Sequence, residues 1–137
     1  MRLFADTGAW CALYDRSDIY HARASAFLQK LKRQKAQLIT SDYVLDESLT
    51  LLRFRAGHKE AVEFGRWVLQ SLLVKVINVD EKIWQVAWEI FVRYDDKRFS
   101  FTDCTSFAIM RQLGLLNAFA FDHNFEQAGF MMLPAEG

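Results

Sequence analysis

The chain contains few of the residues that interrupt or cross-link a fold: six glycines, one proline and two cysteines in 137 residues. Cys11 and Cys104 are far apart and lack the spacing of a metal site, so we expect small core residues in a reduced, cytosolic protein. No uncharged run approaches the ~20 residues of a membrane helix. We also expect no signal peptide, because no charged segment followed by a long apolar stretch opens the chain.

Net charge is also lacking, because 17 basic side chains balance 17 acidic ones. Strong non-specific attraction to nucleic acid is therefore not built in, although a local basic patch beside an acidic pocket would still permit binding. Hydrophobic residues are abundant, at 52%, and include twelve Phe, four Trp and four Tyr. This length and composition predict one domain over residues 1–137 with a full hydrophobic core.

Hydrophobic periodicity and turn residues predict strands and helices that alternate along the chain. The predicted strands cover 2–6, 37–41, 73–79 and 118–122, with a last short strand at 130–133. The predicted helices cover 20–34, 42–56, 58–72, 81–95 and 103–113. Their expected N-caps include Asp18, Asp80 and Thr102, and Gly57 and Gly114 are expected at helix C-termini. This order predicts an α/β fold with a mainly parallel sheet and helices on both faces.

The first predicted strand ends in Asp-Thr-Gly at residues 6–8, a triplet typical of aspartic proteases. Those enzymes are almost entirely β-structure with glycine-rich hairpins. The long helical periodicity of this chain is the main argument against that class, and neither a second triplet nor a glycine-rich flap accompanies it. We therefore interpret Asp6 as an acid of another kind, placed at the tip of a strand.

Asp6 and Asp122 each end a predicted strand. Ligands of open α/β sheets bind beyond the carboxyl ends of the strands, so both carboxylates are candidates for one site. Either one alone could equally be a helix cap or a turn former.

Two helices supply further acids. Glu47 falls at the edge of a predicted apolar face of helix 42–56, whereas Asp46 falls on the opposite side. The residues of that face are Val44, Leu45, Leu49, Leu51, Leu52 and Phe54. Glu47 either has a partner there or extends to water. Asp103 lies in the first turn of its helix, where an acid complements the dipole, but it shares an inward face with Phe107 and Met110.

Asp6, Glu47, Asp103 and Asp122 would repel one another at one edge of a sheet. Hard divalent cations such as Mg²⁺ or Mn²⁺ relieve this repulsion, and no Cys and His cluster indicates zinc. Metal-assisted hydrolysis of phosphate esters uses such a pocket. The residues alone leave open a ribonuclease, a DNA nuclease or phosphatase, and a non-catalytic binding module whose acids cap helices.

Four segments together resemble the PIN-domain ribonucleases, especially the VapC-like toxins of type II toxin–antitoxin pairs. They are LFADTGAW at 3–10, VLDESLTLL at 44–52, FSFTDCTSFAIM at 99–110 and AFAFDHNFEQAGF at 118–130. The resemblance implies a three-layer α/β/α sandwich that binds Mg²⁺ or Mn²⁺. By position, Asp6, Glu47, Asp103 and Asp122 match the family's acidic quartet. Thr7 matches a hydroxyl residue that follows the first acid.

The resemblance also implies an RNA substrate, a homodimer and, for a toxin, a cognate antitoxin; RNA processing without a toxin role is the alternative. The aromatic helix 81–95 is compatible with either core packing or a dimer face. Asp96 is either an accessory acid or a solvated loop residue, and His123 either contacts a phosphate or lies in a surface turn. The candidates for contacts to the RNA backbone are Arg53, Arg55, Lys97 and Arg98.

Overall fold

The computed structural model describes residues 1–136, which build one five-stranded sheet in the order β3-β2-β1-β4-β5. The strands are β1 (Arg2–Ala5), β2 (Gln37–Ser41), β3 (Val74–Ile77), β4 (Asn117–Phe119) and β5 (Met131–Leu133). Every pairing between neighbouring strands is parallel. The first strand of the chain is thus the central one, and the sheet grows from it in both directions.

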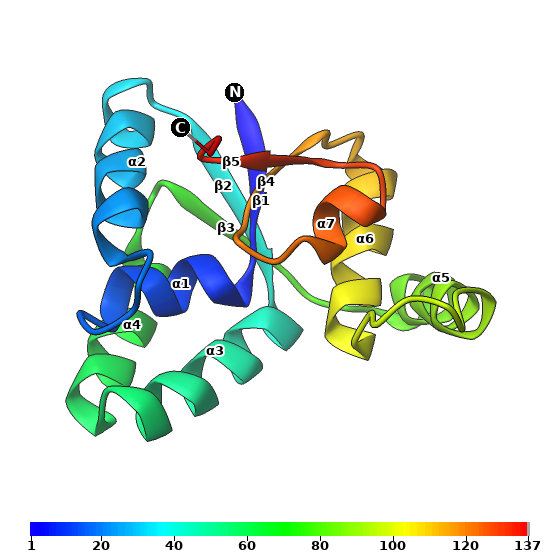
Figure 1. Cartoon of the computed structure of the whole chain (residues 1–137), viewed down its shortest axis with the longest axis horizontal. Helices are drawn as coiled ribbons and strands as arrows, with labels where there is room; N and C mark the ends of the chain where they lie inside the picture. Colours follow the sequence, from blue (N-terminus) through cyan, green and yellow to red (C-terminus); the bar gives the residue numbers. More distant parts are fainter. Residues whose placement is uncertain (137) are drawn as a thin grey trace.

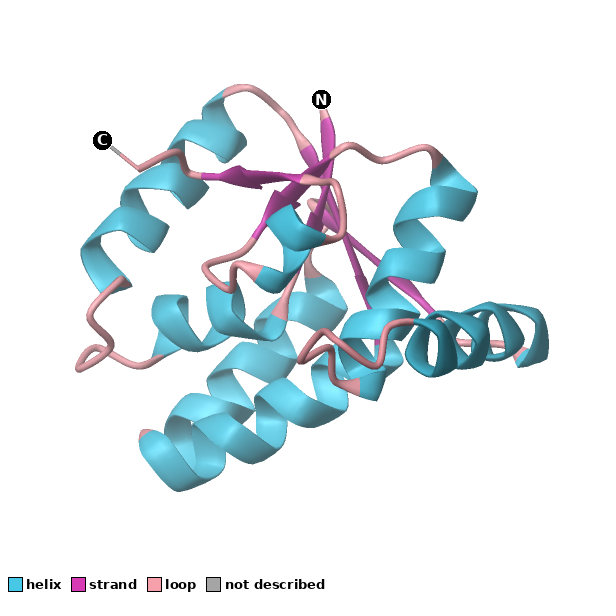
Figure 2. Cartoon of the chain, turned by 45° about the vertical axis from the view of Figure 1, so that its right-hand side comes forward, coloured by secondary structure: helices cyan, strands magenta, loops and turns pink. Residues whose placement is uncertain are grey.

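Helices cover both faces of this sheet, as the sequence predicted. They are α1 (Thr7–Tyr14), α2 (His21–Arg33), α3 (Asp42–Arg55), α4 (His58–Gln70), α5 (Glu81–Arg93), α6 (Phe101–Leu113) and α7 (Asn124–Gln127). Figure 1 shows α1, α2 and α4 on one side and α5, α6 and α7 on the other, with α3 extending beyond the carboxyl ends of the strands. Figure 2 shows the strands passing between these layers. The predicted α/β/α architecture is confirmed.

The hydrophobic core encloses the central strand β1, whose Leu3, Phe4 and Ala5 are fully buried. Burial on both faces explains why this strand is a continuous apolar run rather than an alternating one. Cys11 and Cys104 are buried free thiols, which confirms their expected role in the core. Within residues 1–136, no helix combines the length and apolarity needed to cross a membrane.

Two helices, α1 and α7, were not predicted. The eight residues of α1 include no charged side chain, and five of them are buried. A helix enclosed in this way shows no amphipathic period. The four-residue α7 is too short for a periodic pattern to emerge.

Several predicted boundaries are wrong in detail. Ser100, not Thr102, caps α6, which begins at Phe101. Tyr20, not Asp18, is the N-cap position of α2, and Asp18 instead accepts a hydrogen bond from the Tyr20 N–H at 2.8 Å. The predicted caps at Asp80 and Gly114 are confirmed.

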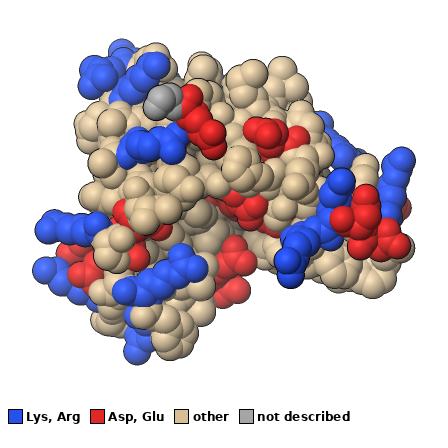
Figure 3. Space-filling view, in the orientation of Figure 1, with Lys and Arg blue, Asp and Glu red and all other residues tan. Residues whose placement is uncertain are grey.

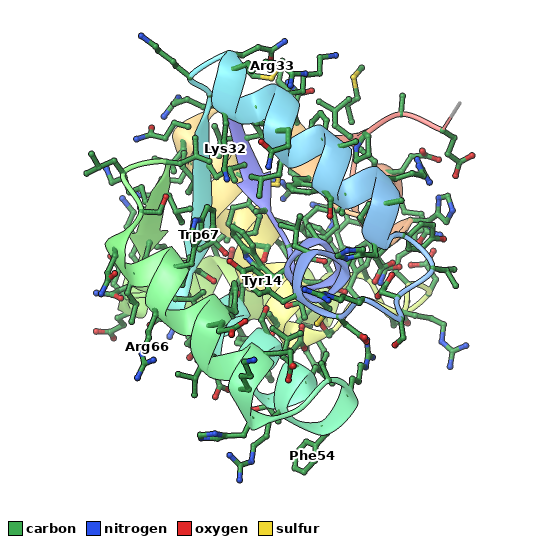
Figure 4. The ribbon with its side chains drawn as sticks, turned by 90° about the vertical axis from the view of Figure 1, so that its left-hand side faces the viewer. Tyr14, Lys32, Arg33, Phe54, Arg66 and Trp67 are labelled. Atoms are coloured by element: carbon green, nitrogen blue, oxygen red, sulfur yellow. The ribbon has the colours of Figure 1, made fainter. Side chains whose placement is uncertain are left out.

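The predicted apolar face of α3 is too wide. Val44, Leu45 and Leu52 are buried, but Phe54 is 81% exposed and Leu49 is also exposed. Figure 4 shows Phe54 at the outer end of the α3–α4 hairpin, pointing away from the molecule. Apolar residues recur with the same helical spacing whether they face the core or an exposed surface, so the sequence pattern alone could not distinguish Phe54 from the buried residues of α3.

Candidate active site

Asp6 lies at the carboxyl end of the central strand, immediately before α1. Chain connections leave β1 toward β2 on one side and reach β4 on the other, so Asp6 occupies the switch point of the sheet, where α/β folds bind ligands. Its side chain is only 4% exposed. Its Oδ1 atom is buried without a hydrogen-bond partner among the described residues, as is the neighbouring Thr7 Oγ1.

The pKa of Asp6 is raised to about 8, mainly because burial disfavours its charged form. The charges of Asp103, Glu47 and Asp122 contribute to this rise, and a hydrogen bond from the backbone N–H of Thr7 opposes it. The other three predicted acids therefore lie close enough to Asp6 for their charges to act on it. The four acids are thus near enough to one another to interact electrostatically, as expected if they share one site.

Backbone and side-chain hydrogen bonds fix the position of Asp6. Its N–H donates to Phe119 O on β4 at 3.0 Å, and its carbonyl accepts from the N–H groups of Ala9 and Trp10 in α1 at 3.0 and 3.2 Å. Beneath it, Trp10 Nε1 donates to Thr40 Oγ1 at 3.2 Å, and that hydroxyl donates to Ala5 O at 2.9 Å. These buried bonds join α1, β2 and β1, so the carboxylate projects from a rigid junction.

Asp103 is held at the start of α6 by a reciprocal capping box with Ser100. Its Oδ2 accepts from the Ser100 N–H at 3.0 Å, and Ser100 Oγ accepts from the Asp103 N–H at 3.0 Å. The carboxylate is 7% exposed. Burial raises its pKa, hydrogen bonds from Ser100 and Asn124 oppose that rise, and the charge of Asp122 adds to it.

Glu47 and Asp122 are more accessible than Asp6 and Asp103. Glu47 is half-buried on α3, and Asp46 is exposed beside it, as the helical phase predicted. Asp122 is exposed and lies three residues beyond β4, which ends at Phe119. It does not end a strand as predicted, because the chain leaves the sheet earlier and carries the acid outward on a loop.

Asn124 is a site residue that the sequence analysis missed. Its Nδ2 lies 3.1 Å from Asp103 Oδ2, 3.4 Å from Asp122 Oδ2 and 3.2 Å from Arg98 O. An amide nitrogen has two hydrogens, so three acceptors share them. Asn124 therefore links the two carboxylates and the preceding loop. An amide two positions after a candidate acid was the available signal.

These side chains fit a hard divalent cation. The donors are carboxylates, their charges are mutually repulsive, and Asp6 presents a buried oxygen without a partner. Within residues 1–136, no three His, Cys, Asp or Glu side chains are gathered tightly enough to hold an ion by themselves. Mg²⁺ commonly binds through one or two carboxylates and keeps several waters, which is compatible with this arrangement.

The remaining predicted residues surround the site. Asp96 is an exposed loop residue whose Oδ2 lies 3.6 Å from Lys97 Nζ, and His123 is exposed in a turn. Arg53, Arg55 and Arg98 are exposed. Figure 3 shows acidic side chains along a central hollow of this face, with basic side chains on both flanks.

A parallel α/β/α sheet with acids around the switch point is an arrangement suited to metal-assisted hydrolysis of phosphodiesters. The family profile described as PIN domain matches residues 3–131. The chain therefore belongs to the PIN domain family, which confirms the predicted family and nuclease class.

Full-length relatives agree with this assignment. The chain is 40% identical over 135 residues to the 23S rRNA-specific endonuclease VapC20 of Mycobacterium tuberculosis, covering 98% of this chain and 99% of the relative. It is 29% identical over 117 residues to a VapC ribonuclease of Archaeoglobus fulgidus, covering 84% and 74%.

Solved structures show the same fold. The crystal structure of Mycobacterium tuberculosis VapC20, described as a sarcin–ricin loop cleaving toxin, matches with a TM-score of 0.85 at 41% identity, over 94% of this chain and 96% of that one. VapBC2 of Rickettsia felis, bound to a promoter DNA fragment, matches with a TM-score of 0.72 at 10% identity over 96% and 97%. At that identity the likeness concerns the fold alone.

Proposed function

We propose that this protein is a divalent-metal-dependent endoribonuclease that acts through a single domain of residues 1–137. The observation that carries the proposal is the buried, unpaired Oδ1 of Asp6 within reach of three other acidic charges. Burying a carboxylate without a partner is costly, and a bound cation compensates that cost. The full-length likeness to an rRNA-specific endonuclease supports RNA as the substrate.

The four acids have two kinds of role in this proposal. Asp6 and Asp103 hold the cation, and Glu47 and Asp122 ligate it directly or through water. Bound Mg²⁺ or Mn²⁺ supplies a lowered pKa for the attacking water and polarises the scissile phosphate. Thr7 orients the Asp6 carboxylate or an adjacent water, and Asn124 positions Asp103 and Asp122.

The substrate we propose is an unpaired loop of ribosomal RNA. The direct test incubates the protein with a hairpin carrying the sarcin–ricin loop of 23S rRNA. Cleavage at one position with Mg²⁺ or Mn²⁺, and none with EDTA, is the expected result. A DNA hairpin of the same sequence distinguishes a ribonuclease from a DNA nuclease, and cleavage that persists in EDTA would contradict the metal requirement.

We further propose that the protein is the toxin of a toxin–antitoxin pair and forms a homodimer. The likeness to a toxin at 41% identity supports the first statement. Exposed Trp88, Phe91 and Val92 on α5 support the second, because large apolar side chains are enriched in homodimer interfaces. Expression should arrest bacterial growth in an Asp6-dependent manner, and light scattering should give twice the chain mass. Active RNA cleavage without growth arrest would favour an RNA-processing role.

A further inference from the structure

A cavity of about 530 Å³ lies next to the acid site and has no role in the chemistry proposed above. Phe121 and His123, the two neighbours of Asp122, both line it. Tyr20 and Arg23 form another part of its wall. The rest of its lining comes from α7, from β5 and from the residues that follow β5. A substrate that reaches Asp122 therefore also reaches the mouth of this cavity.

The wall of the cavity is aromatic and rigid. Tyr20 and Phe121 stack with ring centroids 4.4 Å apart and planes inclined by 5°. The Arg23 guanidinium carbon lies 5.6 Å from the Phe121 centroid and 5.7 Å from that of Tyr20. Arg23 Nη2 also donates to Pro134 O and Ala135 O, both at 3.3 Å. The guanidinium plane is thus fixed while further N–H donors stay available.

The polar groups at the same cavity have mixed character. Arg23 and His123 are donors for carbonyl or phosphate oxygens, and Glu126 and Glu136 are acceptors for N–H groups. His123 Nε2 lies 3.9 Å from Glu136 Oε1. A planar ligand with polar edges and an attached phosphate suits such a wall. Unpaired RNA bases are recognised in this way, by stacking on aromatic or guanidinium planes with hydrogen bonds to their edges.

We propose that this cavity binds an unpaired nucleobase of the RNA, that of a nucleotide next to the scissile phosphate. The inference rests on the proposed ribonuclease function and specifies how that site selects its substrate. A base held here places the adjoining phosphate at Asp122. A peptide segment is disfavoured because the wall combines ring faces with the Arg23 guanidinium directly beside the acid that handles phosphate.

The test uses the Asp6→Asn protein with Mg²⁺ and the sarcin–ricin loop hairpin as probe. The fluorescent base 2-aminopurine replaces one loop nucleotide at a time. We expect strong quenching at one position adjoining the cleavage site, since stacking quenches this base. Arg23→Ala, added to this protein, should weaken hairpin binding about 10-fold, as expected for the loss of one stacked base. Arg33→Ala is the matched control, because Arg33 lies at the far end of α2 and outside the cavity (Figure 4).

Removing the base at the quenched position should weaken hairpin binding by the Asp6→Asn protein as much as Arg23→Ala does. When Arg23→Ala is already present, removing that base should have no further effect.

Glu126→Trp, which fills the cavity from an exposed position, is a second variant for the case in which Arg23→Ala impairs folding. It should weaken hairpin binding in the same way as Arg23→Ala. If the hairpin is neither bound nor cut by the wild type, the ribonuclease proposal fails. If it is bound and cut but Arg23→Ala and Glu126→Trp behave like Arg33→Ala, the base-binding proposal is overturned. Occupation of the cavity by a protein segment, with no effect of base removal, would overturn it as well.

Discussion

The candidate site has two unequal parts. Its floor, which we define as Asp6 and Asp103, is nearly inaccessible, and burial raises the pKa of both carboxyls. Its rim, defined as Glu47 and Asp122, is half-buried or exposed. The floor acids are fixed by a strand end and a capping box, whereas Asp122 stands on a loop. Carboxyl groups are thus buried where ionisation costs the most free energy, and a bound cation, as proposed above, would offset that cost.

The largest effect should follow from neutralising the floor. We expect Asp6→Asn to lower the cleavage rate by at least about 10³-fold, because metal assistance lowers the activation barrier by several kcal/mol. Asp46→Asn is the matched control, since that acid is exposed on the same helix as Glu47 and should leave the rate unchanged. The measurement is single-turnover cleavage of the hairpin. If Asp6→Asn and Asp46→Asn lowered the cleavage rate equally, the special role of Asp6 in the site would be contradicted.

Asn124 connects the floor to the rim, and its loss should have the next largest effect. Asn124→Ala removes the amide shared by Asp103 and Asp122, so we expect a loss of about 10-fold to 100-fold in activity or metal affinity, as for other residues that orient metal ligands. Titration of the rate with Mg²⁺ measures it. Asn78→Ala, at an exposed position, is the control. Activity that fully recovers at high Mg²⁺ would assign Asn124 to affinity alone, and no loss at all would contradict the link.

The floor should also make the metal-free protein less stable at higher pH. The pKa of Asp6 is about 8 in the folded chain against 3.8 in the unfolded one, so the folded state binds more protons between these values. Stability therefore falls as pH rises from about 4 to about 8 and levels off above that range. We expect a loss of several kcal/mol, because each pKa unit corresponds to about 1.4 kcal/mol; urea unfolding in EDTA measures it.

Two comparisons sharpen this pH prediction. Asp6→Asn should make the profile less steep and stabilise the metal-free protein at pH 8, although Asp103, whose pKa is also raised, keeps part of the slope. Asp122→Asn at the rim should change little. Mg²⁺ should recover stability at high pH in the wild type but not in Asp6→Asn, because a ligand bound by the folded state alone stabilises it. If the stability of the wild type did not change between pH 4 and pH 8, ionising the buried Asp6 would carry no free-energy cost and the prediction would be wrong.

The difference between floor and rim also explains which parts of the site could be predicted. Strand ends and helical phase are local properties, so the positions of Asp6, Glu47 and Asp103 could be inferred from the sequence. The depth of burial could not, because it depends on α1, a helix without an amphipathic pattern. Asn124 was missed because an amide becomes informative only once Asp103 and Asp122 are neighbours in space.

The fold was predicted more completely than its edges. The alternation of strands and helices was sufficient to predict a parallel sheet with two helical layers. The end of β4 was not predicted correctly: the strand ends at Phe119, although the apolar residues Ala120 and Phe121 follow it. Phe121 instead stacks on Tyr20, a tertiary contact that no local pattern contains. Exposed Phe54 on α3 was assigned to the core for the same reason.

The smallest effect should come from the basic side chains outside the rim. Arg55 is exposed at the end of α3, and a contact from it to an RNA phosphate carries no sequence information. We expect Arg55→Ala to raise KM about 2-fold to 5-fold, leave kcat unchanged, and reduce the slope of log KM against log salt by about one. Arg66→Ala, an exposed arginine on the outer side of α4 (Figure 4), is the control. If both variants change KM equally, the attraction belongs to the whole surface and not to the flank of the site.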